Sequence, residues 1–173
     1  LREGVKEAIS TLGQGFLSHP ANTTLKERLR SGDLSKEEYF RQLLRLIYRL
    51  LFLFTAEDRD LLLDPRANQT TRDIYFRYYS ASRLRTLANK VPGSKHHDLY
   101  QALRLVMQKL GSPEGCPELG LQPLGTYLWQ PTAVADLENA EIDNASFLKA
   151  VRYLSVTEEN QVKRPVDYKN IGA

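Results

Sequence analysis

The segment Arg41–Leu62, RQLLRLIYRLLFLFTAEDRDLL, constrains the fold more than any other part of the chain. Just before it, Ser35 and Glu38 have the spacing of a capping box, which predicts that a helix begins near Ser35. At 100° per residue, apolar side chains gather on one broad face of this helix: Tyr39, Phe40, Leu43, Leu44, Leu46, Ile47, Leu50, Leu51 and Phe54. The opposite face carries the charged residues Glu38, Arg41, Arg45 and Arg49. The pattern predicts an amphipathic helix near residues 35–60 at the centre of the fold.

A membrane anchor does not fit this segment. A membrane span needs about 20 consecutive apolar residues, whereas the uninterrupted apolar run covers only Leu50–Phe54. Phe52 falls on the otherwise polar side, so we expect the rest of the domain to surround this end of the helix. The interpretation that remains is a central core helix.

Composition sets the class of protein. A chain of 173 residues with 42% hydrophobic and 26% charged residues is typical of one globular domain. A single cysteine, Cys116, allows no internal disulfide and favours a reducing, cytoplasmic setting. Because the chain begins with Leu1 and shows no signal segment, we expect a fragment of a longer protein. Its expected parts are N-terminal short helices (1–34), a helical core (35–110), an ordered loop (111–131) and a C-terminal helix with a lead-in segment (132–173).

The predicted fold class is all-α: an irregular multi-helix bundle around the central helix. Three-and-four spacing predicts short surface helices over residues 1–17 and 22–30, with Gly13 and Gly15 as a helix stop. Ser80 and Ser94 are expected to cap helices that end near residues 90 and 110 and pair as a helical hairpin. A further helix is predicted over residues 144–154, and one small β-hairpin near residues 154–166. The Pro/Gly-rich loop is expected to contain helical turns anchored by Leu119, Leu121, Leu124, Tyr127, Leu128 and Trp129.

Charge is distributed unevenly along the chain. Cations dominate from Arg66 to Lys109, whereas acids dominate from Leu110 to Val162. Because arginines alternate with aromatic residues in DIYFRYYSASRLR, the basic segment could neutralise phosphates and stack on bases. The alternative is an aromatic core cluster with a solvated basic face. The candidate DNA-backbone contacts are Arg72, Arg77, Arg83, Arg85, Lys90 and Lys95.

Two acids end the central helix. If the helix continues through Ala56, Glu57 and Asp58 return to the core side, where buried carboxylates need cationic or amide partners. We therefore expect structural acids, with Arg83 or Arg85 paired to one of them, rather than a catalytic pair.

Motifs for catalysis are weak throughout the sequence. No phosphate-binding G-x-x-x-x-G-K-[ST] loop and no G-x-S-x-G elbow is present. His96 and His97 are adjacent and point about 100° apart on a helix, so they do not form a metal-binding pair. Asp167 and Lys169 supply a D-x-K without a second acid on a strand nearby. We expect no catalytic residue, cofactor site or metal site in this chain.

Several motifs in their order carry a family resemblance. The runs RQLLRLIYRLLFLFTAEDRDLL, YFRYYSASRLR, KHHDLYQALRLVMQKLG, LGTYLW and RPVDYKNIGA resemble the helical region that precedes the catalytic domain of type IIG-like restriction–modification proteins. These are N6-adenine-specific DNA methyltransferases, often fused to an endonuclease. In the family, the stretch similar to VDYKNIGA leads into the methyltransferase domain, and the N-P-P-Y motif and glycine-rich AdoMet loop lie beyond it.

The resemblance implies an accessory role rather than an activity for this chain. S-adenosylmethionine would bind elsewhere in the parent bacterial protein, as would Mg²⁺ if a nuclease is fused. The implied partners are the neighbouring methyltransferase and nuclease or target-recognition domains, together with the DNA backbone, and no membrane. The function expected is that of a scaffold or connector in a phage-defence enzyme. The alternative is a stand-alone helical protein–protein interaction module.

Overall fold

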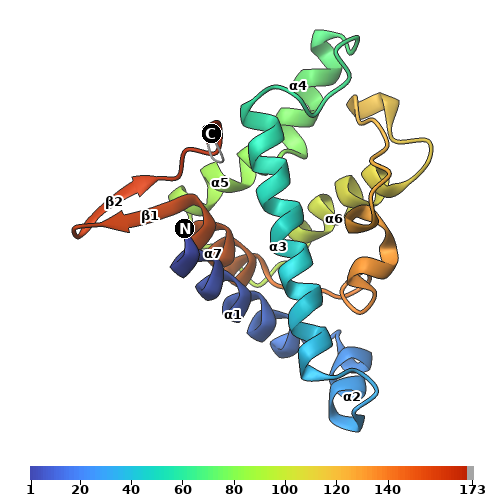
Figure 1. Cartoon of the computed structure of the whole chain (residues 1–173), viewed down its shortest axis with the longest axis vertical. Helices are drawn as coiled ribbons and strands as arrows, with labels where there is room; N and C mark the ends of the chain where they lie inside the picture. Colours follow the sequence, from blue (N-terminus) through green and yellow to red (C-terminus); the bar gives the residue numbers. More distant parts are fainter. Residues whose placement is uncertain (171–173) are drawn as a thin grey trace.

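Helices make up most of this protein, as the sequence predicts. The computed structural model describes residues 1–170, so the last three residues of the run RPVDYKNIGA lie outside the described residues. Within this part of the chain there are seven α-helices and one two-stranded antiparallel hairpin (Figure 1). Their bounds are α1 (Arg2–Ser18), α2 (Thr23–Ser31), α3 (Lys36–Asp58), α4 (Gln69–Tyr78), α5 (Ala81–Lys90), α6 (Asp98–Gly111), α7 (Asn144–Ser155), β1 (Val156–Glu159) and β2 (Val162–Pro165).

The α3 helix runs through the middle of the molecule (Figure 1). It begins as predicted, because the Ser35 hydroxyl accepts a hydrogen bond from the backbone N–H of Glu38. The Glu38 carboxylate does not reach back to the cap. It instead pairs with Arg41 at 3.0 Å and Arg45 at 3.2 Å, one and two turns further along the helix.

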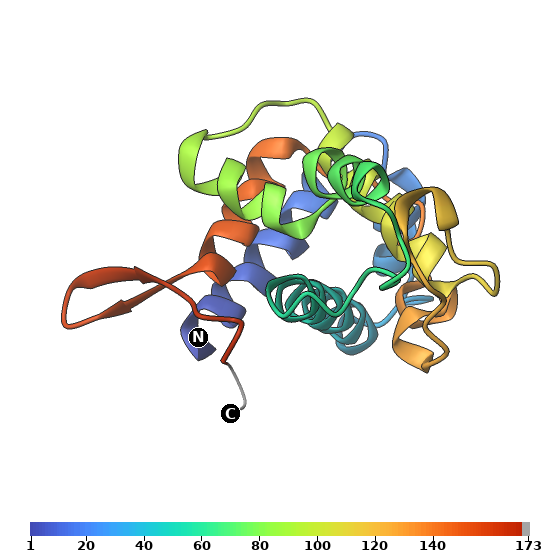
Figure 2. The ribbon, with the colours of Figure 1, turned by 90° about the horizontal axis from the view of Figure 1, so that it is seen from above.

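The buried face of α3 differs in part from the predicted one. Leu43, Ile47 and Leu50 are buried as expected, whereas Phe40 and Phe52 are 51% and 40% exposed. Figure 2 looks along α3 from above and shows the other helices and the 111–143 segment around one side of it only. The prediction that the domain surrounds this helix was therefore wrong. The assignment of Arg49 to the polar face was also wrong, because its side chain is buried.

The α1 helix packs along α7, although the two lie at opposite ends of the sequence (Figures 1 and 2). Its residues Leu12 and Phe16 are fully buried, whereas Lys6 and Glu7 are exposed, so α1 is a surface helix with its apolar face in the core. The predicted helix stop at Gly13 and Gly15 was wrong, because α1 continues to Ser18. A Cβ atom on Gly15 would lie 2.5 Å from the Ile142 side chain. Glycine is needed there for close packing rather than for a turn.

Two adjacent helices, α4 and α5, follow the central helix. The α4 helix, which the sequence analysis did not identify, begins where Asn68 accepts a hydrogen bond from the N–H of Thr71. The α5 helix begins at the predicted cap, with the Ser80 hydroxyl accepting from the N–H of Arg83. The sequence rule for caps therefore holds at both helices.

The predicted hairpin between α5 and α6 was wrong. The α5 helix packs against α7 and α3, and α6 begins at Asp98 instead of next to Ser94. The connecting residues 91–97 cross the start of α7, where the carbonyls of Ser94 and His96 accept from the N–H groups of Ala145 and Asn144. These backbone hydrogen bonds hold the connection extended, so the two helices separate.

The Pro/Gly-rich segment is an ordered loop with helical turns, as predicted. Its turns are η1 (Pro117–Leu119), η2 (Tyr127–Trp129) and η3 (Pro131–Val134). Leu119, Leu121 and Trp129 are buried anchors, whereas Tyr127 is 58% exposed, so the prediction was wrong for that residue. The Tyr127 ring lies against the guanidinium of Arg45, with the ring centre 5.7 Å away.

The predicted β-hairpin is present and projects from the body of the molecule (Figure 1). Val156 pairs with Pro165, and Glu159 pairs with Val162. The two turn residues Asn160 and Gln161 both have positive φ angles, the backbone of a tight two-residue hairpin turn. After β2, the chain returns to the body of the protein.

Candidate docking site for the C-terminal segment

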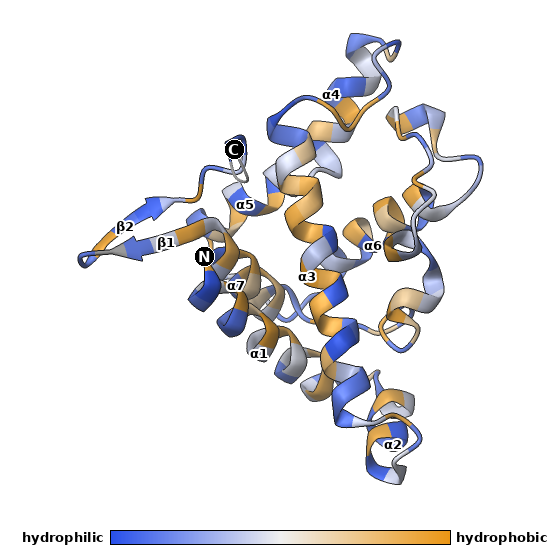
Figure 3. Ribbon diagram, in the orientation of Figure 1, coloured by the Kyte–Doolittle hydropathy of each residue, from blue (hydrophilic) through white to orange (hydrophobic). Residues whose placement is uncertain are grey.

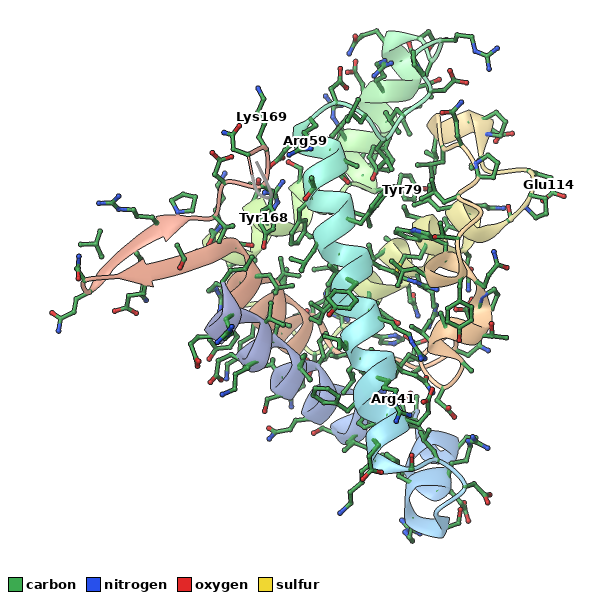
Figure 4. The ribbon with its side chains drawn as sticks, in the orientation of Figure 1. Arg41, Arg59, Tyr79, Glu114, Tyr168 and Lys169 are labelled. Carbon is green, nitrogen blue, oxygen red and sulfur yellow. The ribbon has the colours of Figure 1, made fainter. Side chains whose placement is uncertain are left out.

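Four parts of the chain meet at the C-terminal end of α3. They are α3 itself, α4, the first turn of α5 and residues 166–170. Figure 4 shows Arg59, Tyr168 and Lys169 close together beside the end of α3. The C-terminal segment, defined as residues 166–170, therefore lies on the helical body.

Glu57 lies at the centre of this junction and is 6% exposed. Its carboxylate accepts hydrogen bonds from the Tyr75 hydroxyl at 2.6 Å and from the backbone N–H groups of Ala81 at 2.8 Å and Ser82 at 2.7 Å. These two N–H groups belong to the first turn of α5, where no carbonyl within the helix can accept from them. Burial raises the pKa of Glu57 above its ordinary value, and the three donors oppose that rise. Glu57 thus joins α3, α4 and α5 with a single side chain.

Asp58 forms an ion pair with Arg85, which was one of its two predicted partners. The two side chains approach to 2.6 Å and are 29% and 16% exposed. The Arg85 guanidinium carbon also lies 4.7 Å from the centre of the Phe54 ring and 5.5 Å from the centre of the Tyr168 ring. A guanidinium stacks favourably on aromatic faces. Arg85 therefore connects α5 to both α3 and the C-terminal segment.

Tyr168 anchors the C-terminal segment to the core. Its side chain is 1% exposed, and its hydroxyl donates to the carbonyl of Leu154 at the end of α7. Its ring packs against Phe54 with the ring centres 5.1 Å apart. Burial raises the pKa of Tyr168, so the hydroxyl stays protonated and remains a donor. The segment is thus attached to α3 and α7 by one residue.

Backbone hydrogen bonds fix the segment on either side of Tyr168. The N–H of Val166 donates to the carbonyl of Ser155 at 2.9 Å, and Nε of Arg59 donates to the carbonyl of Lys169 at 2.8 Å. The carboxylate of Asp167 accepts from the N–H groups of Lys169 and Asn170, which closes a local turn. The predicted D-x-K thus forms a turn.

Three of the six candidate DNA contacts, Arg72, Arg83 and Arg85, make hydrogen bonds within the protein. Arg72 donates to the carbonyls of Ala67 and Asp64, and Arg85 is used in the junction described above. Arg83 donates to the carbonyl of Tyr78 at 3.0 Å.

The three remaining candidates, Arg77, Lys90 and Lys95, are exposed. Arg77 lies near the end of α4, just before α5 begins, whereas Lys90 is the last residue of α5. A ten-residue helix spans about 15 Å, so these two cations lie near opposite ends of α5. Contact with DNA stays a prediction for these three residues.

The side chains of this junction pack against one another and form hydrogen bonds within the protein. In residues 1–170, no group of three or more His, Cys, Asp or Glu side chains is arranged to hold a metal ion. Every helix in this range is too short or too polar to cross a bilayer. No protein-family model, curated protein or solved structure matches this chain. The geometry of the junction is therefore the main basis for a functional argument.

Sequence reasoning missed two features of the junction. The first is the anchoring role of Tyr168, although an aromatic residue between Asp167 and Lys169 is a recognisable candidate for burial. The second is that the Glu57 carboxylate accepts from the first N–H groups of α5. Glu57 lies far from α5 in the sequence, so no local sequence pattern predicts this contact.

Proposed function

We propose that this chain is the accessory helical domain of an AdoMet-dependent, adenine-specific DNA methyltransferase from a restriction–modification or phage-defence system. Its work is that of a connector, which holds the start of the following catalytic domain in a fixed position. The observation that carries the proposal is the burial of Tyr168 between α3, α5 and α7. S-adenosylmethionine, and Mg²⁺ where a nuclease is fused, belong to the other domains of the parent protein.

The anchoring of the C-terminal segment supports a rigid connection. A flexible linker would show few contacts, because a solvated chain keeps its conformational freedom. Here Val166 and Tyr168 are hydrogen-bonded to the end of α7, and the carbonyl of Lys169 is hydrogen-bonded to Arg59 at the end of α3. The chain therefore reaches residue 170 in a defined position on the helical body.

The first test of the connector role is the sequence of the parent gene. The gene downstream of Ala173 is expected to encode a glycine-rich AdoMet loop and an N-P-P-Y motif. A stop codon soon after Ala173 would instead support a stand-alone interaction module.

In the parent enzyme, we expect Tyr168→Ala to lower the methylation rate while leaving the affinity for S-adenosylmethionine unchanged. The physical reason is misplacement of the catalytic domain, since an error of about 1 Å in positioning can lower a rate by about 100-fold. Methyl transfer to DNA and calorimetric titration with S-adenosylmethionine measure the two quantities. Tyr127→Ala is the matched control, because Tyr127 is 58% exposed and lies outside the junction. An unchanged rate in a folded Tyr168→Ala enzyme would contradict the connector role.

Contact with the DNA backbone is the second part of the proposal. Arg77 and Lys95 are exposed cations, and cations that neutralise phosphates release counterions. Binding by the chain should therefore be independent of base sequence, with a Kd of about 10⁻⁴–10⁻⁶ M that rises steeply with salt.

We expect Arg77→Glu with Lys95→Glu to weaken this binding equally for all DNA sequences and to reduce its salt dependence. Fluorescence anisotropy at several salt concentrations measures both effects. The matched control is Lys6→Glu with Lys149→Glu, which makes the same charge change on α1 and α7. Equal weakening by both pairs would show that only net charge matters and would remove the assignment to Arg77 and Lys95.

A further inference from the structure

The β-hairpin and the C-terminal segment depend on one buried side chain. Figures 1 and 2 show the hairpin pointing away from the helices in both views. All four side chains of β2 are exposed, and Figure 3 shows hydrophilic residues along much of both strands. Among the side chains that the structure describes in residues 156–170, Tyr168 is the only buried one. Tyr168 is therefore the main apolar attachment of this part of the chain.

The hairpin has little to stabilise it apart from its two ends. An isolated two-stranded hairpin is at best marginally stable in water. Here Val156 and Thr157 are half-buried next to α7, whereas the turn residues Asn160 and Gln161 and the whole of β2 are exposed. We therefore expect the hairpin to be ordered only while both ends are held, by α7 at one end and by Tyr168 at the other.

The site that receives the Tyr168 ring contains a buried hydrogen-bond donor without a partner. Nη1 and Nη2 of Arg85 donate to Asp58 at 3.2 Å and 2.6 Å. Nε of the same guanidinium is buried and has no acceptor within the described residues, and no other side-chain nitrogen or oxygen there shares this state. A buried donor without an acceptor lowers stability, because water would bond to it after opening. The site therefore favours the docked ring through packing and opposes it through this donor.

We propose that residues 156–170 form a latch, which opens as one unit about Ser155 and Val156 while the helices stay folded. In the closed state, the Tyr168 ring packs against Phe54 and Arg85. In the open state, Phe54 and Arg85 lose the ring that covers them, and the hairpin loses its order. Segments held by few apolar contacts open at a lower free energy than the whole domain. The inference concerns the described residues alone and does not depend on the proposed function.

Native-state hydrogen exchange of the 173-residue chain, resolved by NMR, tests the latch. The hydrogen-bonded amides of residues 156–170 are expected to exchange together and faster than those of α3 and α7. Their exchange should also depend only weakly on added denaturant, because opening the latch exposes much less surface than global unfolding.

Replacing Tyr168 with alanine should accelerate exchange throughout the latch by roughly 100–1,000-fold, or to the rate of an unstructured peptide, because a buried aromatic side chain is lost. The amides of α3 and α7 should remain protected. Tyr168→Phe keeps the ring but loses the hydrogen bond to Leu154, so it should accelerate the same amides by only roughly 2–10-fold. Tyr127→Ala is the matched control, because Tyr127 is 58% exposed and lies outside the latch.

Three results would overturn the latch. If the latch amides of the native chain exchanged only with those of α3 and α7, residues 156–170 would be an integral part of the helical body. Unchanged exchange in the hairpin of Tyr168→Ala would show that the hairpin and Tyr168 open separately. Loss of protection in both α3 and α7 of the same variant would show that the helices need Tyr168 to stay folded.

Discussion

Replacing Arg49 with methionine is expected to lower the free energy of unfolding by about 3 kcal/mol. Arg49 is 1% exposed and donates to the carbonyls of Leu128 at 2.7 Å and Gln130 at 2.9 Å. Hydrogen bonds from a charged donor each contribute about 1.5–3 kcal/mol, and methionine would leave both carbonyls without this partner. The loss is reduced because the variant no longer buries a charge. Thermal unfolding should show a melting temperature lower by roughly 6–12 °C.

The chain contains a single tryptophan, Trp129, which lies between these two carbonyls and reports directly on the loop. Its indole is 3% exposed, and the Arg49 guanidinium carbon lies 5.6 Å from its ring centre. In Arg49→Met, its fluorescence should shift to longer wavelength at temperatures below the main transition, because the loop loses its anchor. Arg41→Met is the matched control on the same helix, since Arg41 is 59% exposed. If the two variants melted alike, Arg49 would not be the anchor of this loop.

Replacing Glu57 with glutamine is expected to lower the free energy of unfolding by about 2–3 kcal/mol. Glutamine has almost the same shape, but its amide group would direct N–H donors at a site where Tyr75, Ala81 and Ser82 already donate. At least one donor would lose its acceptor, and the remaining hydrogen bonds would lose their charge. Chemical denaturation at pH 7 measures the change. Glu114→Gln is the control, because Glu114 is exposed and lies outside the junction (Figure 4).

The raised pKa of Glu57 predicts how the free energy of unfolding changes with pH. Its folded pKa is raised above the ordinary value of 4.5 because burial disfavours the charged form. In the interval above pH 4.5, the folded state therefore binds more protons than the unfolded state. The contribution of Glu57 to stability then decreases as pH rises from 4.5 through the folded pKa. The difference in stability between the native chain and Glu57→Gln should narrow over this interval, and a widening difference would contradict the assigned direction.

Local sequence signals were sufficient to predict the starts of α3 and α5. Ser35 and Ser80 each cap a helix as predicted, because an N-cap depends on residues within one turn. The same rule could have identified α4 from Asn68 and Thr71. The beginning of α6 was not predictable from Ser94, because backbone bonds to Asn144 and Ala145 hold that segment extended. Those partners lie about fifty residues further along the chain.

Helical periodicity predicted which residues of α3 share a face. It could not predict which other parts of the protein pack against each face. It placed Asp58 where a cation from the basic segment could reach it, and Arg85 occupies that position. It also grouped Arg49 with the exposed polar residues. Periodicity cannot show that the carbonyls of Leu128 and Gln130 lie against this side of α3 and accept from Arg49. Tyr168 could not be assigned for the same reason, because its pocket is made by α3, α5 and α7 together.

The pairing of α1 with α7 has a consequence for biosynthesis. The ribosome completes α1 at Ser18 and must then add residues 19–143 before α7 begins. At 5–20 residues per second, this interval lasts roughly 6–25 s. During that time α1 lacks α7, the helix along which it packs, while α3, α4 and α5 can already assemble through Glu57. The nascent chain therefore presents the apolar side of α1 to chaperones until α7 has been synthesised.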